Sequence, residues 1–400
     1  ASTIAHETAH MWFGDLVTMR WFTDVWMKEV FANFMAAKIV NPSFPDINHD
    51  LRFLHAYYPA AYEVDRTPGT NAIRQPLDNL KDAGTLYGAI IYQKAPIVMR
   101  QLEALIGEET FRDGLREYLR NHAYGNASWP DLIALLDRRT PDDLEAWSRA
   151  WVEEPGRPII HTTLTLQGDR IGSLTLTQRD PIAARGLTWT QDVEVVLGDA
   201  NGTSLRRLPV RLTGAQTTVP AASGLPAPRF VLVNGGGRAY GELHLDPASL
   251  TWLSTSIDRI ADPLTRGSAW VTLWDAVLTG ELPAGRFLDL VATALPRERD
   301  ELNVQRILAY LRRAFWTFST PGARLPRIRP LEQLLTDRLN AAGTVSLRSS
   351  YFSALRDIAG TPQTTAWLTD VWRGDVKVEG LPLAENDFIV LAEELAVRGV

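Results

Sequence analysis

The chain has 400 residues, no cysteine, and 41 basic against 47 acidic side chains, which gives a formal net charge of −6. The negative charge gives no reason to expect a nucleic acid or an anionic membrane as a partner. The absence of cysteine excludes disulfides, thiolate zinc sites and cysteine nucleophiles. No apolar run is long enough to span a membrane, and we expect a cytoplasmic protein.

The first 154 residues have the apolar periodicity of helices. Apolar side chains recur at intervals of three and four in residues 24–40, 90–106 and 109–121, and we expect a helix at each. The following Glu-Glu-Pro-Gly-Arg-Pro, residues 153–158, has the proline and glycine content of a boundary. A helical first part is therefore predicted at 1–154.

Residues 155–246 alternate between apolar and polar side chains, as half-buried strands do. The segments expected to be strands are 162–166, 173–177, 192–197, 206–212, 229–233 and 242–245. Asn201-Gly202 is a hairpin signal between two of them. The triple glycine at 235–237 lacks the lysine and hydroxyl residue of a phosphate loop, and we interpret it as a hairpin loop. This part is predicted to be a small β-sandwich.

In residues 247–400 the helical pattern returns, in short pieces separated by proline and glycine. Such a succession is typical of stacked helix pairs, as in an α-solenoid. The predicted fold is therefore multidomain and mainly α. It has a helical first part, a β-sandwich and an α-helical C-terminal domain.

The most informative residues are His6-Glu7-Thr8-Ala9-His10. Residues four apart on a helix lie about 40° from each other around the axis, so both imidazoles can reach one metal ion. Glu7 can then hold a metal-bound water without binding the metal itself. Catalytic zinc usually takes a third protein ligand, and Glu29 follows His10 after eighteen residues on the next helix-like segment.

This spacing resembles the signature of the gluzincin aminopeptidases of the aminopeptidase N family. Residues 5–19 are similar to that family's zinc helix and the turn after it, and residues 154–158 resemble its junction between catalytic domain and sandwich. The resemblance implies that residues 1–154 are the helical half of a thermolysin-like catalytic domain. The chain departs from the family at Lys28 and Val30, where asparagine and glycine are common.

The resemblance implies a zinc-dependent aminopeptidase that releases N-terminal amino acids from peptides with a free N-terminus. One zinc ion would be held by His6, His10 and Glu29. Glu7 would act as the general base that takes a proton from the attacking water and returns it to the leaving amine.

Ile91-Tyr92-Gln93-Lys94-Ala95 resembles the family segment whose tyrosine stabilises the tetrahedral intermediate, although Ala95 stands where glycine is usual. Tyr92 is therefore the candidate oxyanion donor. Tyr87 resembles a second tyrosine near the site of leukotriene A4 hydrolase and is a candidate substrate-binding residue. The competing interpretation of both is a core tyrosine with a satisfied hydroxyl.

The remaining polar candidates receive ordinary interpretations. Asn33, one helical turn beyond Glu29, is interpreted as a helix-surface residue, the alternative being a partner of the ligands. The histidines without an acid or histidine partner at ligand spacing are expected to have surface or core roles. They are His49, His55, His122, His161 and His244.

Two parts of the family pattern do not occur in these residues. The Gly-Ala-Met-Glu-Asn segment, whose glutamate binds the substrate amine, is not found, and only five residues precede His6 where the family has a sheet. We expect the chain to belong to a longer polypeptide whose missing N-terminal portion is its partner. The alternatives are another gluzincin hydrolase, either an endopeptidase or of the leukotriene A4 hydrolase type, and a non-catalytic binding module with a structural zinc.

Overall fold

The computed structural model describes residues 1–81, 84, 87–199 and 201–400. They form two compact units, Ala1–Ser249 and Leu250–Val400. The predicted mainly helical class, with a β-sandwich between helical parts, is confirmed. The three-part division at residues 154 and 246 stays a prediction.

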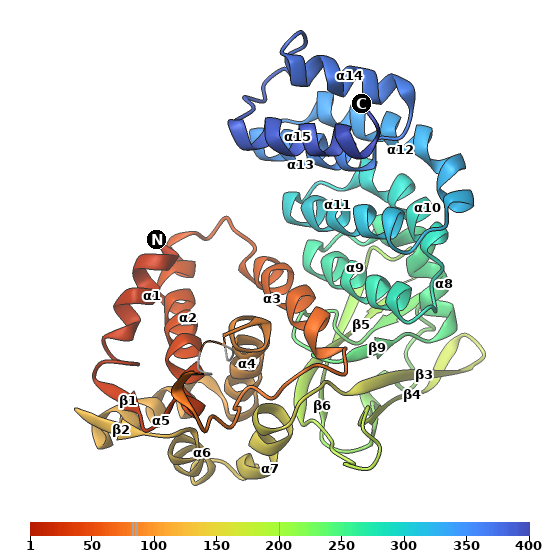
Figure 1. Cartoon of the computed structure of the whole chain (residues 1–400). Helices are drawn as coiled ribbons and strands as arrows, with labels where there is room; N and C mark the ends of the chain where they lie inside the picture. The colour runs from red at the N-terminus through yellow and green to blue at the C-terminus, as the bar shows by residue number, and fades with distance from the viewer. Residues whose placement is uncertain (82–83, 85–86, 200) are drawn as a thin grey trace. The chain divides into compact units, whose positions relative to one another are not determined.

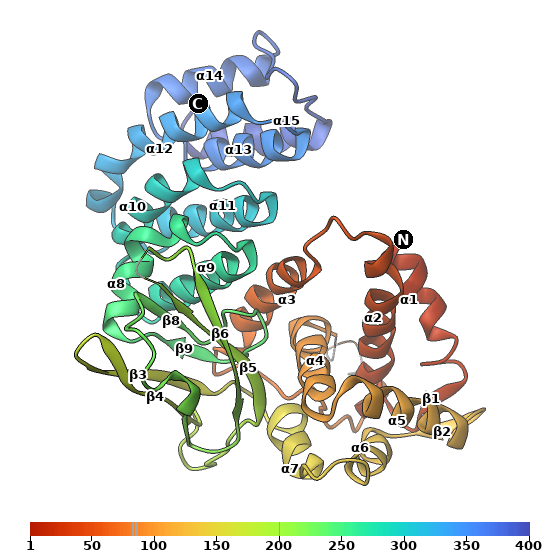
Figure 2. The ribbon, with the colours of Figure 1, turned by 180° about the vertical axis from the view of Figure 1, so that it is seen from behind.

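The first unit begins with helices that lie beside its sheets (Figure 1). The helices of this part are α1 (Ser2–His10), α2 (Trp26–Val40), α3 (His49–Asp65), α4 (Ala95–Ile106), α5 (Glu108–Asn121), α6 (Trp129–Asp137) and α7 (Leu144–Ser148). The helix predicted at 90–106 starts with a π-helical turn, η4 (Ile90–Lys94), before α4 begins. A second π-turn, η5 (Arg149–Glu153), follows α7. Figures 1 and 2 both show α1 and α2 side by side, with α4 on the side of α2 that faces away from α1.

Buried aromatic rings hold the first two helices in place. The rings of Phe13 and Phe31 stack with centroids 4.7 Å apart, which fixes the turn after α1 against α2. Trp26, at the start of α2, packs on Trp129 of α6 with centroids 4.9 Å apart. All four rings are buried, and such pairs stabilise by about 0.5–1.5 kcal/mol beyond their area burial. The position of α2 relative to α1 is therefore set by the core.

Two sheets pack face to face in the rest of the first unit. Their strands are β3 (Ile159–Gln167), β4 (Arg170–Arg179), β5 (Gln191–Gly198), β6 (Leu205–Leu212), β7 (Gln216–Thr218), β8 (Phe230–Leu232) and β9 (Glu242–His244). The strands β1 (Val17–Met19) and β2 (Gly125–Ala127) form a separate parallel pair among the helices. One sheet has the order β7-β4-β3-β9 and the other β6-β5-β8. Leu174 and Leu176 of the first sheet meet Val193 and Val195 of the second in one buried core.

The predicted hairpin at Asn201-Gly202 joins the antiparallel strands β5 and β6, and Gly202 has a left-handed φ of 74°. The hairpin interpretation of the triple glycine is wrong, because β8 pairs with β5 whereas β9 pairs in parallel with β3. The glycines instead cross between the two sheets. A side chain at Gly235 would overlap Val196, so close packing explains this glycine.

The second unit is helical, apart from its short connections. Its helices, beginning with one that spans the boundary, are α8 (Pro247–Ser256), α9 (Pro263–Leu278), α10 (Ala284–Ala294), α11 (Glu301–Trp316), α12 (Pro321–Ala341), α13 (Val345–Ile358), α14 (Pro362–Arg373) and α15 (Glu385–Val397). Neighbours in sequence pack together, for example α12 with α13 and α14 with α15. None of the helices found in the described residues has the length and apolar character required to cross a membrane.

Candidate metal centre

Two helices bring the three predicted ligands together. His6 and His10 lie one turn apart on α1, and Glu29 lies in the first turn of α2. The two histidine Nε2 atoms are 3.1 Å apart, and Glu29 Oε2 is 3.5 Å from Nε2 of His6 and 3.9 Å from Nε2 of His10. In the part of the chain that the structure describes, these three residues are the only group of three or more histidine and acidic residues whose possible ligand atoms all lie within 4.8 Å of one another.

The other nitrogen of each imidazole faces an oxygen. Nδ1 of His6 is 3.1 Å from Asn33 Oδ1, and Nδ1 of His10 is 3.0 Å from the backbone oxygen of Phe13. Because a carbonyl oxygen can only accept a hydrogen bond, each Nδ1 carries the proton and donates it. Each Nε2 atom then presents a lone pair toward Glu29. The tautomer of both histidines is thus fixed by their partners.

This set of donors fits a zinc ion. Two lone pairs and a carboxylate that face one another are repulsive without a cation between them. Nitrogen ligands about 2.0–2.1 Å from a tetrahedral ion lie about 3.3 Å apart, which is close to the observed 3.1 Å. Two imidazoles and one carboxylate are also a ligand set that leaves a fourth position for water or substrate.

Lys28 occupies the other side of the Glu29 carboxylate. Its Nζ lies 3.5 Å from Glu29 Oε1, whereas Oε2 faces the histidines. The ammonium therefore neutralises one oxygen and leaves the second directed at the cluster. The lysine at position 28, where the family commonly has asparagine, therefore leaves Glu29 available as a ligand.

Glu7 follows His6 on α1 and has an exposed side chain. An exposed carboxylate beside the cluster can be approached by a substrate from solvent. Its assignment as general base stays a prediction.

Tyr92 lies within η4, and the ring of Tyr87 stacks on it with centroids 6.1 Å apart. Tyr87 is 38% exposed and Tyr92 is half-buried, so the pair forms a partly open aromatic surface. Burial raises the pKa of the Tyr92 phenol, and electrostatic interactions with Glu29 and with Tyr87 raise this pKa further. The turn η4 packs against α2, the helix that carries Glu29. A tyrosine pKa above about 10 keeps the phenol protonated and able to donate at neutral pH.

The interpretation of Asn33 as a helix-surface residue is wrong. Asn33 is half-buried on α2, and its Oδ1 accepts the hydrogen bond from His6. Its position four residues after Glu29 places both side chains on one face of the helix. That spacing was the signal from which this role could be predicted.

Two of the remaining histidines lie together in the sandwich. The parallel register of β3 and β9 places His161 opposite His244, and their rings stack with centroids 4.2 Å apart. Nε2 of His244 also lies 2.8 Å from Glu242. Sequence spacing did not indicate the His161–His244 contact, because these residues come from distant strands.

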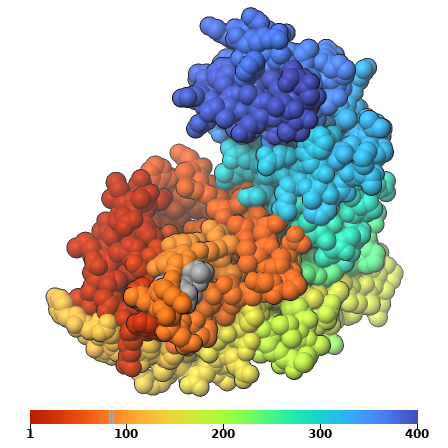
Figure 3. Space-filling view, viewed as in Figure 1, coloured from red at the N-terminus to blue at the C-terminus, as the bar shows by residue number. Residues whose placement is uncertain are grey.

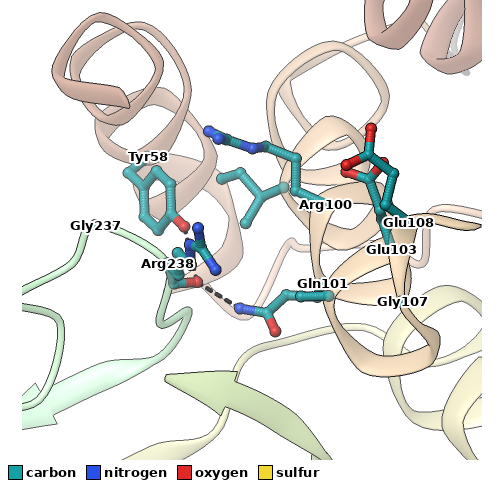
Figure 4. Close-up of a pocket in the computed structure, with 10 residues that line it drawn as sticks. Tyr58, Arg100, Gln101, Glu103, Gly107, Glu108, Gly237 and Arg238 are labelled. Carbon is teal, nitrogen blue, oxygen red and sulfur yellow. Dashed lines mark hydrogen bonds between the residues drawn. The ribbon is translucent and has the colours of Figure 1, made fainter. Parts of the chain in front are cut away.

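The pocket in Figure 4 contains none of the predicted site residues. It has a volume of about 240 Å³ and lies between α3, α4 and the loop that carries Gly237 and Arg238. Tyr58 Oη and Gln101 Nε2 both donate to the backbone oxygen of Arg238, at 2.9 and 2.5 Å (Figure 4). This pocket marks the seam between the helical part and the sandwich.

Comparison with known proteins gives two family matches. Residues 1–151 match the peptidase family M1 domain, and residues 230–386 match the ERAP1-like C-terminal domain. The first match contains every predicted site residue.

Individual relatives agree with these matches. Aminopeptidase N of Streptomyces lividans is 30% identical over the whole chain, and a puromycin-sensitive aminopeptidase of Caenorhabditis elegans is 28% identical over 74% of it. A leucyl aminopeptidase of Saccharolobus solfataricus is 33% identical over 41% of the chain. The chain spans 48% of the length of the first of these proteins, 31% of the second and 21% of the third.

Proposed function

Because the chain belongs to the peptidase M1 family, we propose that it carries the zinc site of an aminopeptidase that removes N-terminal amino acids from peptides. The observation that carries the proposal is the convergence of two histidine lone pairs and one carboxylate, from a His-Glu-x-x-His helix and the helix after it. In the proposed enzyme His6, His10 and Glu29 hold one zinc ion.

A bound zinc ion would polarise the scissile carbonyl and lower the pKa of a water molecule toward about 7. Glu7 takes the proton from the attacking water and passes it to the leaving amine nitrogen. Tyr92 donates a hydrogen bond to the carbonyl oxygen as that oxygen gains negative charge, an interaction of a type that contributes about 3 kcal/mol in other hydrolases. The phenol of a tyrosine, with an ordinary pKa of about 10, carries the proton for this hydrogen bond at neutral pH.

Three neighbours prepare the ligands for this chemistry. Asn33 and the Phe13 carbonyl hold the histidine rings by their Nδ1 atoms, and Lys28 binds the far oxygen of Glu29. Tyr87, which is partly exposed beside Tyr92, lines the surface where a peptide would lie.

The carboxylates that would bind the free amine of the substrate are proposed to come from an N-terminal portion of the same protein. Ile4, Met11 and Trp12 expose large apolar surfaces on and after α1, as expected of a helix that further polypeptide covers. In the space-filling view the N-terminal residues, drawn in red, lie at the surface beside the orange residues of the first unit (Figure 3).

The proposal is tested with Glu7→Gln in the natural protein that contains this chain. We expect one zinc ion per chain in both forms, and cleavage of amino-acid anilides only by the parent protein. Cleavage by the zinc-loaded variant at the parent rate would refute the role of Glu7. Equal cleavage of N-blocked peptides by the parent would favour an endopeptidase.

A further inference from the structure

Lys94 and Asp65 form a fully buried ion pair. Lys94 Nζ lies 2.9 Å from Asp65 Oδ2, and both side chains have 0% exposure. Removing two charges from water is costly, and such a pair persists only where further hydrogen bonds complete it. The pair lies outside the predicted metal centre, and the proposed reaction does not use it.

Further hydrogen bonds reach both carboxylate oxygens of Asp65 and the Nζ atom of Lys94. Asp65 accepts hydrogen bonds from Thr70 Oγ1 at 2.7 Å, from the backbone N–H of Gly156 at 3.1 Å and from Tyr240 Oη at 3.0 Å. Lys94 Nζ donates to the backbone oxygen of Gly156 at 2.8 Å. The pair thus joins the end of α3, the turn η4, the segment after η5 and the loop before β9.

That loop is itself fixed to the helices at several points. The backbone oxygen of Arg238 accepts the two hydrogen bonds seen at the seam in Figure 4, and the N–H of Gly241 donates to Tyr62 Oη at 3.3 Å. Tyr240 lies between Arg238 and Gly241 in the loop, and its ring packs on that of Tyr62, with ring centroids 5.0 Å apart. Asp65 is therefore held from the sandwich side as well as from α3.

Lys94 and Tyr92 share the same π-turn. A π-turn advances each residue by about 80°, so side chains two residues apart point to nearly opposite sides. Lys94 points into the interior, whereas Tyr92 is half-buried and stacks on the partly exposed ring of Tyr87, and η4 itself packs against α2. A turn of this kind is locally unfavourable and needs an anchor, and Lys94 supplies one directly behind Tyr92.

We propose that Lys94 is a positioning residue, which fixes the rotation of η4 through Asp65 and so places the Tyr92 phenol beside the metal centre. The inference rests on the role of Tyr92 in the proposed function. It adds that the sandwich, through Tyr240, takes part in holding the catalytic tyrosine. A misplacement of about 1 Å at a reacting group can lower a rate about 10²-fold.

The test is the double variant Lys94→Met with Asp65→Asn, which removes both charges and leaves no buried charge unpaired. The matched control is Arg266→Met with Glu298→Gln, which removes another buried ion pair in the second unit. In that pair Arg266 Nη2 lies 2.6 Å from Glu298 Oε1. Both are made in the natural protein that contains this chain.

The first readout is the ring resonance of Tyr92 in ¹³C-tyrosine-labelled protein without metal, assigned by its loss in Tyr92→Phe. We expect this resonance to move or broaden in the Lys94/Asp65 variant and to stay unchanged in the control. The second readout is turnover, where kcat should fall about 10–100-fold with little change in KM. The control should keep the kcat of the parent protein.

An unchanged Tyr92 resonance together with an unchanged kcat would overturn the inference. If Tyr92→Phe retains full turnover, the proposed role of Tyr92 fails, while the resonance still reports whether Lys94 positions the ring. Should the double variant fail to fold, Tyr240→Phe removes one hydrogen bond to Asp65 and keeps the ring. It is expected to shift the same resonance and lower kcat severalfold, and an unchanged resonance would count against the inference.

Discussion

The hydrogen bond from His6 to Asn33 gives the sharpest prediction about metal affinity. Asn33→Ala removes the oxygen that lies 3.1 Å from His6 Nδ1 and leaves a half-buried N–H without this acceptor. The ring is then free to rotate, and the proton is free to move to Nε2, which would remove a lone pair from the site. Loss of such a partner typically lowers metal affinity 10–100-fold, which is about 1.4–2.8 kcal/mol.

The matched variant is Asn33→Asp, which keeps the position of the accepting oxygen and adds a charge. A carboxylate accepts a hydrogen bond roughly twice as strong as a neutral acceptor does, so zinc affinity should equal or exceed that of the parent. The assay is competition for zinc with a chelating indicator at neutral pH, with the thermal unfolding of each metal-free variant as the control for folding. Parent-like affinity in a folded Asn33→Ala protein would refute the reasoning.

Three further predictions concern stability. Gly235→Ala should lower the free energy of unfolding by about 1–3 kcal/mol because the new methyl group overlaps Val196. The control Gly214→Ala places its methyl group in open space and should leave the free energy of unfolding unchanged. Equal effects of the two variants in denaturant titration would contradict this prediction. Trp26→Ala should cost about 3–5 kcal/mol in the same titration through the cavity left in the core, and a loss below 1 kcal/mol would contradict it. Burial by itself would raise the pKa of Asp180, but hydrogen bonds from Arg185 and from backbone amides lower this pKa overall. The ionised carboxylate therefore stabilises the folded protein fully above the unfolded pKa of about 4, and this stabilisation is lost as the pH falls through the lower pKa of the folded state. Asp180→Asn should therefore weaken the acid dependence of unfolding, and an unaltered acid limb would count against this linkage.

The pairing of the two histidines could be predicted because its determinants are local. His6 and His10 meet through the periodicity of one helix, whereas Glu29 reaches them only because the core packs α2 against α1. The first relation depends on the pitch of a helix and not on the rest of the fold. All strands of the sandwich except the short β7 were predicted for the same reason, since alternation is a property of each strand separately.

Two features that the sequence did not predict depend on contacts between distant residues. The crossing of the triple glycine between sheets follows from the pairing partners of β8 and β9, which no residue near Gly235 specifies. His161 meets His244 only through the register of two strands that are far apart in the chain. Local rules of turn chemistry indicated a tight loop at the glycines but could not supply its partners.

The tyrosine segment combines both kinds of determinant. The residues around Tyr92 identify the segment, but its periodicity is that of an ordinary helix, whereas the structure has a π-turn whose last residue, Lys94, pairs with Asp65 in the interior. A buried charge without its partner would cost several kcal/mol, so the extra residue of the turn is stable only after α3, the junction and the sandwich have assembled around it. A local signature can therefore name the candidate catalytic tyrosine, whereas its placement depends on the assembled first unit.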